Sequence, residues 1–516
     1  MQAGKDRSMK EYLLGIDIGT SACKIAVFRQ DGTAVEKENG NYAVYYPKRG
    51  WAEQDPDEWW QAVGNAIKRI FERGKVRPEN IAGIGIDGQS WSAIPIDPEG
   101  NVLSRTPIWF DVRSRDICRR LEARIGKDRL FDVAGNPLSP SYTTAKILWY
   151  KENTPEVYQH TDKILQSNSF IAYRLTGKAC QDLSQGYGLH CFDMQTGSWD
   201  FKMAAEIGIP EKFLPEIVAC STVIGTVTKK ASGETGLLEG TPVVPGGLDA
   251  ACGTLGAGVT EAGMTQEQGG QAGGMSICMD EPKADPSLIL GFHVVPGKWL
   301  LQGGTTGGGG VMRWLERELG GYERLKEKET AKSSLVQFNE LAAAVRPGSD
   351  GLIFLPYMAG ERSPIWDPDA RGVYFGLDFS KTKGHLIRAA MEGVAFALKH
   401  NLDTAEKAGA SVGELRAMGG SANSVLWTQI KSDITGKPIA VPFSDAATTL
   451  GAAILAGVGI GMYPDCTEAA RQTVHVTRRH EPNPDRDAFY KKNYKIYLEL
   501  YQDLKGLMKK AGERQD

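Results

Sequence analysis

One short segment near the start of the chain constrains its fold more than any other: the run LGIDIGTS, from Leu14 to Ser21. Side chains alternate faces along a β-strand, so Asp17 points away from Ile16 and Ile18 and ends an apolar run with one carboxylate. The Gly-Thr-Ser turn lets backbone N–H groups approach phosphate oxygens, and the Mg²⁺ of a nucleotide would partner the carboxylate. The segment indicates a kinase or an ATPase. A hairpin whose aspartate caps its own turn is the alternative.

Length and charge balance narrow the choice further. The chain has 516 residues, more than a single ordinary core holds, so we expect two large domains with a ligand cleft between them. Its 60 basic and 63 acidic residues nearly cancel, which disfavours nucleic acid and membranes as partners. The eight cysteines lack zinc-ligand spacing, and neither a secretory core at the start nor an 18-residue apolar run occurs. We therefore expect a soluble, cytoplasmic protein.

Strand and helix patterns alternate along the chain, which favours an α/β fold. A second apolar strand, Ile81 to Ile86, exits into Asp87-Gly88-Gln89, and an amphipathic helix is predicted over 57–73. Glycine is dense from about residue 241 to 310, which predicts loops and close backbone approach rather than a packed core.

We place the domain boundary after residue 258, which gives one domain over 10–258 and another over 259–510. The end of the chain, over 487–509, is predicted to form a helix that docks on the rest of the protein. Its apolar residues at helical spacing are Phe489, Ile496, Leu500, Leu504 and Met508.

The nucleotide signal follows neither of two common patterns, because GxxxxGK[ST] is absent and no GxGxxG follows the first strand. Several Gly-rich turns from both domains could instead surround a nucleotide together. Each turn alone is more often an ordinary tight turn, but four of them split across the boundary favour a shared site. They span residues 15–21, 269–274, 303–310 and 419–423.

Several segments resemble those of the FGGY carbohydrate kinases, members of the actin, hexokinase and Hsp70 ATPase superfamily. GVYFGLDFSKTKGHLIRAAME, Gly372 to Glu392, meets the later family signature in full. SYTTAKILWYKEN, Ser141 to Asn153, meets the earlier one except at Tyr150, where an aliphatic residue or Phe is usual. FLPYMAGERSP and RAMGGSANSVLWTQIKSDITGKP are also similar to family segments. Within the family, the chain most resembles the xylulokinase-like branch. The resemblance implies two actin-like (ribonuclease H-like) ATPase domains with a cleft between them.

The resemblance also implies an activity: transfer of the γ-phosphoryl group of ATP, with Mg²⁺, to a hydroxyl of a linear sugar. Asp249, in PGGLDAACG, matches the family aspartate that takes the proton from the attacking hydroxyl, and its small neighbours leave room for substrate. A turn aspartate is the alternative for Asp249. Asp17 is expected at the metal. The residues expected at the nucleotide are Asp17, Gly19, Thr20, Ser21, Gly270, Gln271, Gly303, Thr305, Gly419, Gly420, Ser421 and Asn423.

Sugar binding is expected from the first domain. Gln89 and Trp91 lie beyond a strand end, and PIWFDVRS supplies Trp109 with a paired acid and base, Asp111 and Arg113. An aromatic face beside a carboxylate and a guanidinium is a mix that commonly holds polyols. Asp111 and Arg113 form a structural ion pair in the alternative interpretation.

Two departures from the family pattern bear on ligands. Bacterial xylulokinases usually carry Met-His after the equivalent of Gln89 and Asn before that of Asp111, where this chain has Ser90-Trp91 and Phe110; GQAG at 270–273 replaces the frequent GTSG. A pentulose such as xylulose is the leading substrate, with gluconate, a deoxy-ketohexose, glycerol or erythritol as alternatives. A non-catalytic sugar sensor and an Hsp70-like ATPase scaffold are alternatives of another class. A homodimer is expected only by analogy with the family.

Overall fold

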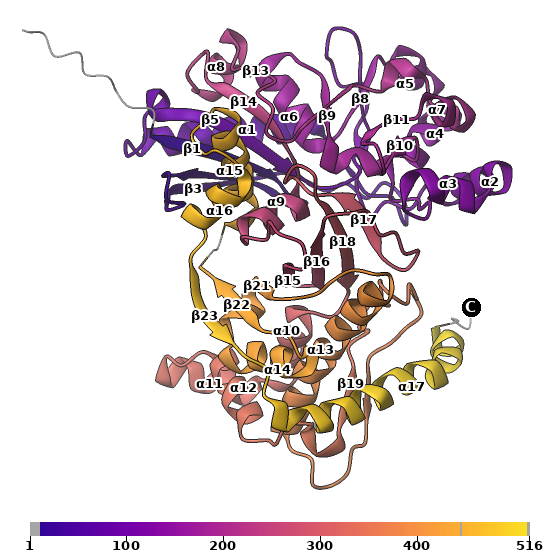
Figure 1. Cartoon of the computed structure of the whole chain (residues 1–516), viewed down its shortest axis with the longest axis vertical. Helices are drawn as coiled ribbons and strands as arrows, with labels where there is room; N and C mark the ends of the chain where they lie inside the picture. The colour runs from indigo at the N-terminus through magenta and orange to yellow at the C-terminus, as the bar shows by residue number, and fades with distance from the viewer. Residues whose placement is uncertain (1–10, 444–445, 513–516) are drawn as a thin grey trace, which may run out of the picture.

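The computed structural model describes residues 11–443 and 446–512 of the chain. Two mixed β-sheets lie at the centres of two α/β domains, one formed mainly by the first half of the chain and one by the second half (Figure 1). The strand order is β13-β14-β5-β1-β2-β3 in the first sheet and β17-β18-β16-β15-β21-β22-β23 in the second. The predicted two-domain α/β fold is confirmed. Within the described ranges, no helix has both the length and the apolar character of a membrane span.

The two sheets share one arrangement. In the first sheet β1, β5 and β14 run parallel while β2 and β3 pair antiparallel, and in the second sheet β15, β21 and β22 run parallel while β16 and β18 pair antiparallel. The first sheet consists of β1 (Tyr12–Ile18), β2 (Ala22–Phe28), β3 (Ala34–Asn41), β5 (Ile81–Gly88), β13 (Gly225–Thr226) and β14 (Pro242–Leu248). The second consists of β15 (Thr265–Gly269), β16 (Gly273–Met279), β17 (Ile289–Phe292), β18 (Trp299–Thr305), β21 (Leu415–Met418), β22 (Ile439–Pro442) and β23 (Val476–His480).

Helices and shorter strands surround these sheets. The helices not discussed separately are α2 (Arg115–Ile125), α3 (Lys127–Ala134), α4 (Thr143–Asn153), α5 (Pro155–His160), α6 (Ser167–Thr176), α7 (Phe201–Ile207), α8 (Lys229–Thr235), α10 (Gly309–Leu319), α11 (Gly321–Thr330), α12 (Ser334–Ala343), α13 (Lys383–Lys407), α14 (Val425–Thr435) and α16 (Cys466–Thr473). The shorter strands are β4 (Glu53–Gln54), β6 (Ile94–Ile96), β7 (Thr106–Pro107), β8 (Lys163–Leu165), β9 (Cys180–Asp182), β10 (Phe192–Asp193), β11 (Ser198–Trp199), β12 (Glu216–Val218), β19 (Ile353–Leu355) and β20 (Val373–Phe375).

Helix α1 (Pro56–Glu72) confirms the amphipathic helix predicted over 57–73. Asp55 caps its start by accepting a hydrogen bond from the backbone N–H of Asp57, and a proline occupies the first helical position, where its missing N–H costs nothing. The residues on the predicted apolar face, Trp60, Val63, Ile67 and Ile70, are buried.

The glycine-dense stretch over 241–310 forms mostly strands and a helix, so the prediction of loops rather than a packed core is wrong. It contains β14, helix α9 (Asp249–Gly256) and strands β15 to β18. The predicted close backbone approach does occur: a Cβ atom on Gly256 would lie 1.9 Å from the carbonyl oxygen of Ala447. Glycine is used here because two backbones cross in direct contact, which is compatible with regular structure.

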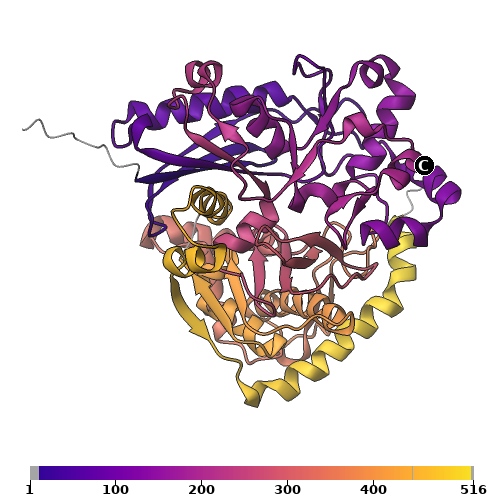
Figure 2. The same cartoon turned by 45° about the horizontal axis from the view of Figure 1, so that its top comes forward.

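One helix from the second half of the chain returns to the first sheet. Helix α15 (Ala447–Gly459) packs against β1, β5 and α9, and Figure 2 shows it as a gold coil beside the indigo strands. The packing is close, since a Cβ atom on Gly85 would lie 1.9 Å from the carbonyl oxygen of Ala452. The predicted boundary after residue 258 falls between the strands of the two sheets. A single boundary does not describe α15, which follows the second domain in the sequence but packs on the first sheet.

Helix α17 (Asp487–Gly512) runs along the outside of the second domain and contacts α13, α14 and β19 (Figures 1 and 2). The predicted docking helix is therefore present. Its predicted apolar face is wrong at Phe489, which is 62% exposed. The residues that anchor the helix are instead mainly tyrosines, which combine a large apolar ring with a hydroxyl that can be satisfied inside the protein. They are Tyr490, Tyr494, Tyr497 and Tyr501.

Candidate active site

Three aspartates meet at one edge of the first sheet. Asp17 on β1 and Asp87 on β5 are register partners in a parallel pair, and Asp249 directly follows β14, the neighbouring parallel strand. Ligands of open α/β sheets bind beyond the carboxyl ends of the strands, where side chains distant in sequence come together. The fold thus brings the predicted catalytic residue and the predicted metal residue into one cluster.

This cluster is short of hydrogen-bond donors. Oδ2 of Asp17 accepts hydrogen bonds from Nζ of Lys24 at 2.9 Å and from Oγ1 of Thr448 at 3.0 Å. Oδ1 of Asp17 and both oxygens of Asp87 are buried without a hydrogen-bond partner in the described structure. Burial and the nearby Asp17 raise the pKa of Asp249 to about 7 and raise the pKa of Asp87 well above its usual range. A carboxylate with a pKa near 7 suits a proton acceptor, and the unpartnered oxygens suit a cation.

Asp87 was not among the site residues predicted from the sequence. The signal was present, since Asp87 precedes Gly88 at the end of an apolar strand just as Asp17 precedes a Gly-containing turn. Both strands place their aspartate at the same level of the sheet because the parallel register pairs the two residues.

Replacing Asp87 with asparagine is expected to change how stability depends on pH. The folded state of the wild type keeps a proton on Asp87 above the ordinary carboxyl pKa of about 4, so its stability falls as the pH rises through that window. Asparagine carries no such proton. The free energy of unfolding in urea with EDTA should therefore fall less from pH 5 to pH 8 in Asp87→Asn than in the wild type. Parallel curves would contradict this, and Asp116→Asn, a change at an exposed carboxylate, is the control.

The turn between β1 and β2 is held by side chains from other segments of the first domain. Oγ1 of Thr20 accepts a hydrogen bond from the indole of Trp109 at 3.0 Å, and the carbonyl oxygen of Thr20 accepts one from Nε2 of Gln54 at 2.8 Å. The N–H of Gly19 donates back to the hairpin, while Ser21 is exposed. Trp109, predicted at the sugar, therefore positions the turn that was predicted at the nucleotide.

Two other predicted sugar residues are engaged with each other. Arg113 donates to both carboxylate oxygens of Asp111 at 2.8–3.0 Å and to Glu53 at 2.7 Å, and its guanidinium lies over the ring of Trp51. Asp111 and the Arg113 side chain are almost wholly buried. This geometry supports the structural ion pair of the alternative interpretation. Gln89 is likewise 1% exposed and donates to Oε1 of Gln54 at 2.6 Å.

A cavity of about 150 Å³ lies between the two halves of the chain. Among the five predicted sugar residues, Trp91 lines it. Leu248 and Ala250 also line it, and these residues flank Asp249, so the cavity opens beside the predicted base. The cavity is also lined by Ser90, Tyr187, Gln268, Ser276, Gln302, Gly304, Arg362 and Trp366. Trp91 has a backbone φ of +60°, a strained conformation for a bulky residue that is found more often at functional sites.

A second cavity, of about 280 Å³, lies in the second domain beside α10, α12 and α14. The predicted nucleotide residues that line it are Gly270, Gln271, Gly420, Ser421 and Asn423. Three other predicted nucleotide residues from the second half of the chain do not line it. Thr305 is buried and donates its hydroxyl to Gly307, Gly303 lines the cavity between the halves, and Gly419 packs on the backbone of the 269–270 turn. Arg313 on α10 and Asn339 on α12, which were not predicted from the sequence, also line this cavity.

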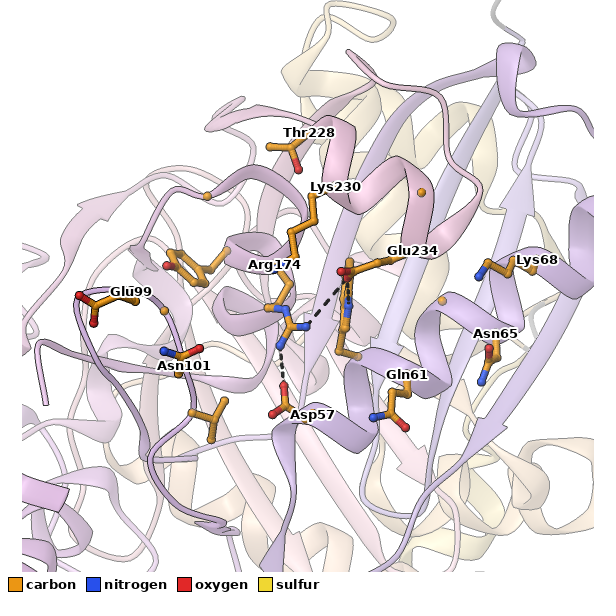
Figure 3. A pocket seen from close by; sticks show the side chains of 17 residues that line it. Asp57, Gln61, Asn65, Lys68, Glu99, Asn101, Arg174, Thr228, Lys230 and Glu234 are labelled. Carbon is orange, nitrogen blue, oxygen red and sulfur yellow. Dashed lines mark hydrogen bonds and ion pairs between the residues drawn. The ribbon is translucent and has the colours of Figure 1, made fainter. Parts of the chain in front are cut away.

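A larger cavity, of about 1150 Å³, lies on the outer face of the first domain (Figure 3). Its central Arg174 is paired with Asp57 at 2.5 Å and with Glu234 at 4.0 Å, and Trp60 also donates to Glu234 at 2.6 Å. The central charges are thus paired with each other, and none of the three clustered aspartates lines the cavity. We do not assign the active site there.

Comparison with known proteins identifies the family. The N-terminal domain model of the FGGY family of carbohydrate kinases matches residues 12–256, and the C-terminal domain model matches residues 274–460. The chain belongs to this family. The resemblance drawn from the sequence is confirmed, and the FGGY kinase is an enzyme, a phosphotransferase acting on carbohydrates.

Similar proteins cover nearly the whole FGGY kinase. A xylulose kinase of Bacillus subtilis (strain 168) is 29% identical over 96% of this chain and 98% of its own, and a gluconokinase of the same organism is 31% identical over 95% and 96%. The solved structure of a ligand-bound xylulose kinase from Lactobacillus acidophilus has a TM-score of 0.87 and 27% identity, and the match covers 97% of this chain and all of that one.

One further residue of the FGGY kinase, Lys146 on α4, supports the cavity between the halves. It is fully buried, and its Nζ donates to the carbonyl oxygens of Trp91 at 2.7 Å and Ile108 at 2.9 Å. Burial lowers its pKa to about 7. Lys146 therefore fixes the strained Trp91 backbone to the loop that carries Trp109.

Replacing Lys146 with methionine is expected to raise the KM for sugar about tenfold, since the Trp91 loop loses its anchor, while the KM for ATP changes less than twofold. Steady-state kinetics would measure both constants. Tyr150→Phe is a matched control, because the Tyr150 hydroxyl on the same helix bonds the carbonyl oxygens of Ala93 and Arg105, farther along the same two segments. Equal rises in both KM values, or an equal effect in Tyr150→Phe, would contradict the role of Lys146.

Proposed function

We propose that this FGGY kinase transfers the γ-phosphoryl group of ATP to a primary hydroxyl of a linear sugar, a pentulose such as xylulose. The observation that carries the proposal is the position of Asp249. It lies where the cavity between the halves meets the carboxylate cluster, and its pKa is raised to about 7. A carboxylate there can accept the proton of a bound hydroxyl as the phosphoryl group is transferred.

In this proposal the nucleotide binds in the second domain. The cavity beside α10, α12 and α14 has room for an adenosine, and its Gly-rich walls present backbone groups to phosphates. The carbonyl oxygens of Gly270 and Gln271 in the GQAG turn accept hydrogen bonds from the start of α10. The N–H of Gly309 donates to Gly270 at 2.7 Å, and the N–H of Gly310 donates to Gln271 at 3.0 Å. This contact fixes the turn on the helix without the hydroxyls that GTSG would provide.

Mg²⁺ fits the carboxylate cluster as a companion of the nucleotide. Asp17 keeps one buried oxygen without a partner, and Asp87 keeps two. In the part of the chain that the structure describes, no group of three or more His, Cys, Asp or Glu side chains is arranged to hold a metal by itself. Mg²⁺ commonly takes one or two carboxylates together with phosphate oxygens and water, which matches this donor set. When bound, the ion would neutralise charge on the phosphates, and Lys24 and Thr448 would orient Asp17.

Gluconate is the second candidate substrate. A gluconokinase is as similar to this chain as a xylulose kinase is, and Ser90-Trp91 stands where xylulokinases usually have Met-His. We do not propose the sugar sensor or the ATPase scaffold, because the family match identifies a carbohydrate kinase.

The test is ADP release by the purified protein with ATP and Mg²⁺ against xylulose, other pentuloses, deoxy-ketohexoses, gluconate, glycerol and erythritol. We expect one strong responder, with xylulose first. A strong response to gluconate alone would replace the pentulose with an acidic sugar. Silence across the panel, with ATP still bound in a direct binding assay, would overturn the proposed substrates.

A further inference from the structure

Arg362 presents a positive charge with no hydrogen-bonded partner to the cavity between the halves. Its guanidinium makes no hydrogen bond and no ion pair within the described structure, although it is the charged residue among those that line this cavity. The other lining side chains that carry polar atoms are neutral: Ser90, Trp91, Tyr187, Gln268, Ser276, Gln302 and Trp366. An arginine in so enclosed a place usually has a partner, because leaving water costs free energy that hydrogen bonds must offset.

The surrounding loop holds Arg362 in place. The carbonyl oxygen of Arg362 accepts a hydrogen bond from the N–H of Trp366 at 2.6 Å, and its own N–H donates to the carboxylate of Glu361 at 2.7 Å. The adjacent Ser363 is bonded through its hydroxyl to both backbone groups of Gly304. Because the backbone is fixed on both sides, the base of the Arg362 side chain is held at the edge of the cavity before a ligand binds.

A glycine brings the guanidinium to the floor of the cavity. A Cβ atom on Gly304 would lie 2.5 Å from one terminal nitrogen of Arg362, so the side chain lies directly on the β18 backbone. Gly304 is paired in the sheet with Gly274, which follows the GQAG turn, and the opposite wall carries Ala250 beside Asp249. Arg362 thus lies between the phosphate-binding turn of the second domain and the predicted base of the first.

We propose that Arg362 binds an oxyanion that enters this cavity, either the phosphoryl group in transfer or the carboxylate of an acidic sugar. This inference rests on the proposed function for the identity of the anion. Guanidinium suits both sources, since its planar donors match two oxygens of a carboxylate or of a phosphate.

The test compares Arg362→Gln and Arg362→Lys with the wild type. Arg371→Gln is the matched control, because Arg371 belongs to the same loop region but donates to the carbonyl oxygens of Pro368 and Ala370 instead of facing the cavity. Calorimetry without nucleotide measures binding of D-gluconate and of the neutral xylitol. Turnover is measured with each accepted sugar, and thermal unfolding is measured with inorganic phosphate.

If the anion is the phosphoryl group, Arg362→Gln lowers kcat at least tenfold for every sugar, and binding of gluconate and xylitol stays within twofold. If it is a carboxylate, gluconate binding weakens at least tenfold while xylitol binding is unchanged. In both cases Arg362→Lys loses less of the measured kcat or gluconate affinity than Arg362→Gln does, because lysine keeps the positive charge. Arg371→Gln behaves as wild type.

Values of kcat and gluconate affinity within twofold of wild type in a folded Arg362→Gln protein would overturn the proposal. If the wild type phosphorylates none of the sugars, thermal unfolding with inorganic phosphate still tests whether Arg362 binds an oxyanion. A rise in the unfolding temperature with inorganic phosphate that Arg362→Gln abolishes would support the oxyanion site without the proposed function. The same rise in both proteins would overturn it.

Discussion

Replacing Asp249 with asparagine is expected to lower kcat roughly 100-fold or more and to leave ATP binding unchanged. The amide has nearly the shape of the carboxylate but cannot accept a proton from the sugar hydroxyl. It also removes one of three neighbouring acidic groups, so the variant should fold and unfold at a temperature no lower than that of the wild type. Phosphorylation rates, nucleotide binding and thermal unfolding together separate lost chemistry from lost structure.

The pH profile provides an independent check on Asp249. The proton acceptor works as a carboxylate, so kcat/KM of the wild type should fall as the pH drops below about 7, where Asp249 becomes protonated. This acidic limb should be lost from the residual activity of Asp249→Asn. Near-normal turnover in the variant would refute the assignment, and Asp116→Asn, at an exposed carboxylate on α2, is the control for a simple loss of charge.

Replacing Gly85 with alanine is expected to destabilise the protein by roughly 3 kcal/mol or more. The added Cβ atom would lie 1.9 Å from the carbonyl oxygen of Ala452, so α15 must move away from the centre of the first sheet. The atoms that the added Cβ meets are backbone atoms of Ala452, not the end of a flexible side chain. The backbones of β5 and α15 are both buried at this contact. Such a cost is a large part of the 5–15 kcal/mol that stabilises an ordinary domain. Urea unfolding measures the difference in free energy.

Gly506→Ala is the matched control for Gly85→Ala. Gly506 lies inside α17, where a Cβ atom meets nothing within 4 Å, so alanine should stabilise the helix by up to about 1 kcal/mol. Opposite signs for the two Gly→Ala changes would show that contact, rather than chain flexibility, sets the cost. A loss below 1 kcal/mol in Gly85→Ala would mean that α15 adapts to the extra atom.

The predictions for the candidate site that rest on local sequence pattern need only a short stretch of the chain. Asp17 ends an apolar strand before a Gly-containing turn, and Ser421 lies in a Gly-rich turn before a helix; both signals are complete within about ten residues. The apolar positions of α1, three or four residues apart, were equally local. Family resemblance added Asp249, whose own neighbours indicate only a turn or a small-residue stretch.

The missing parts depend on contacts between distant segments. Asp87 joins the aspartate cluster through its parallel register with Asp17, and Arg362 lines the cavity that the two halves enclose. Asp111 and Arg113 are two residues apart and looked like ligands, but Glu53 and Trp51 complete an ion pair that faces inward. Local sequence lists the groups that can bind a ligand, whereas the fold decides which of them are already engaged.

The return of α15 to the first sheet ties the order of synthesis to the order of folding. On the ribosome, β1, β5 and β14 emerge long before residues 447–459, so the face of the sheet that α15 covers stays uncovered until most of the chain has been made. A fragment that ends near residue 258 would carry the same uncovered face. The first domain of this kinase is therefore not an independently folding piece, and a fragment of it needs α15 supplied as a partner peptide.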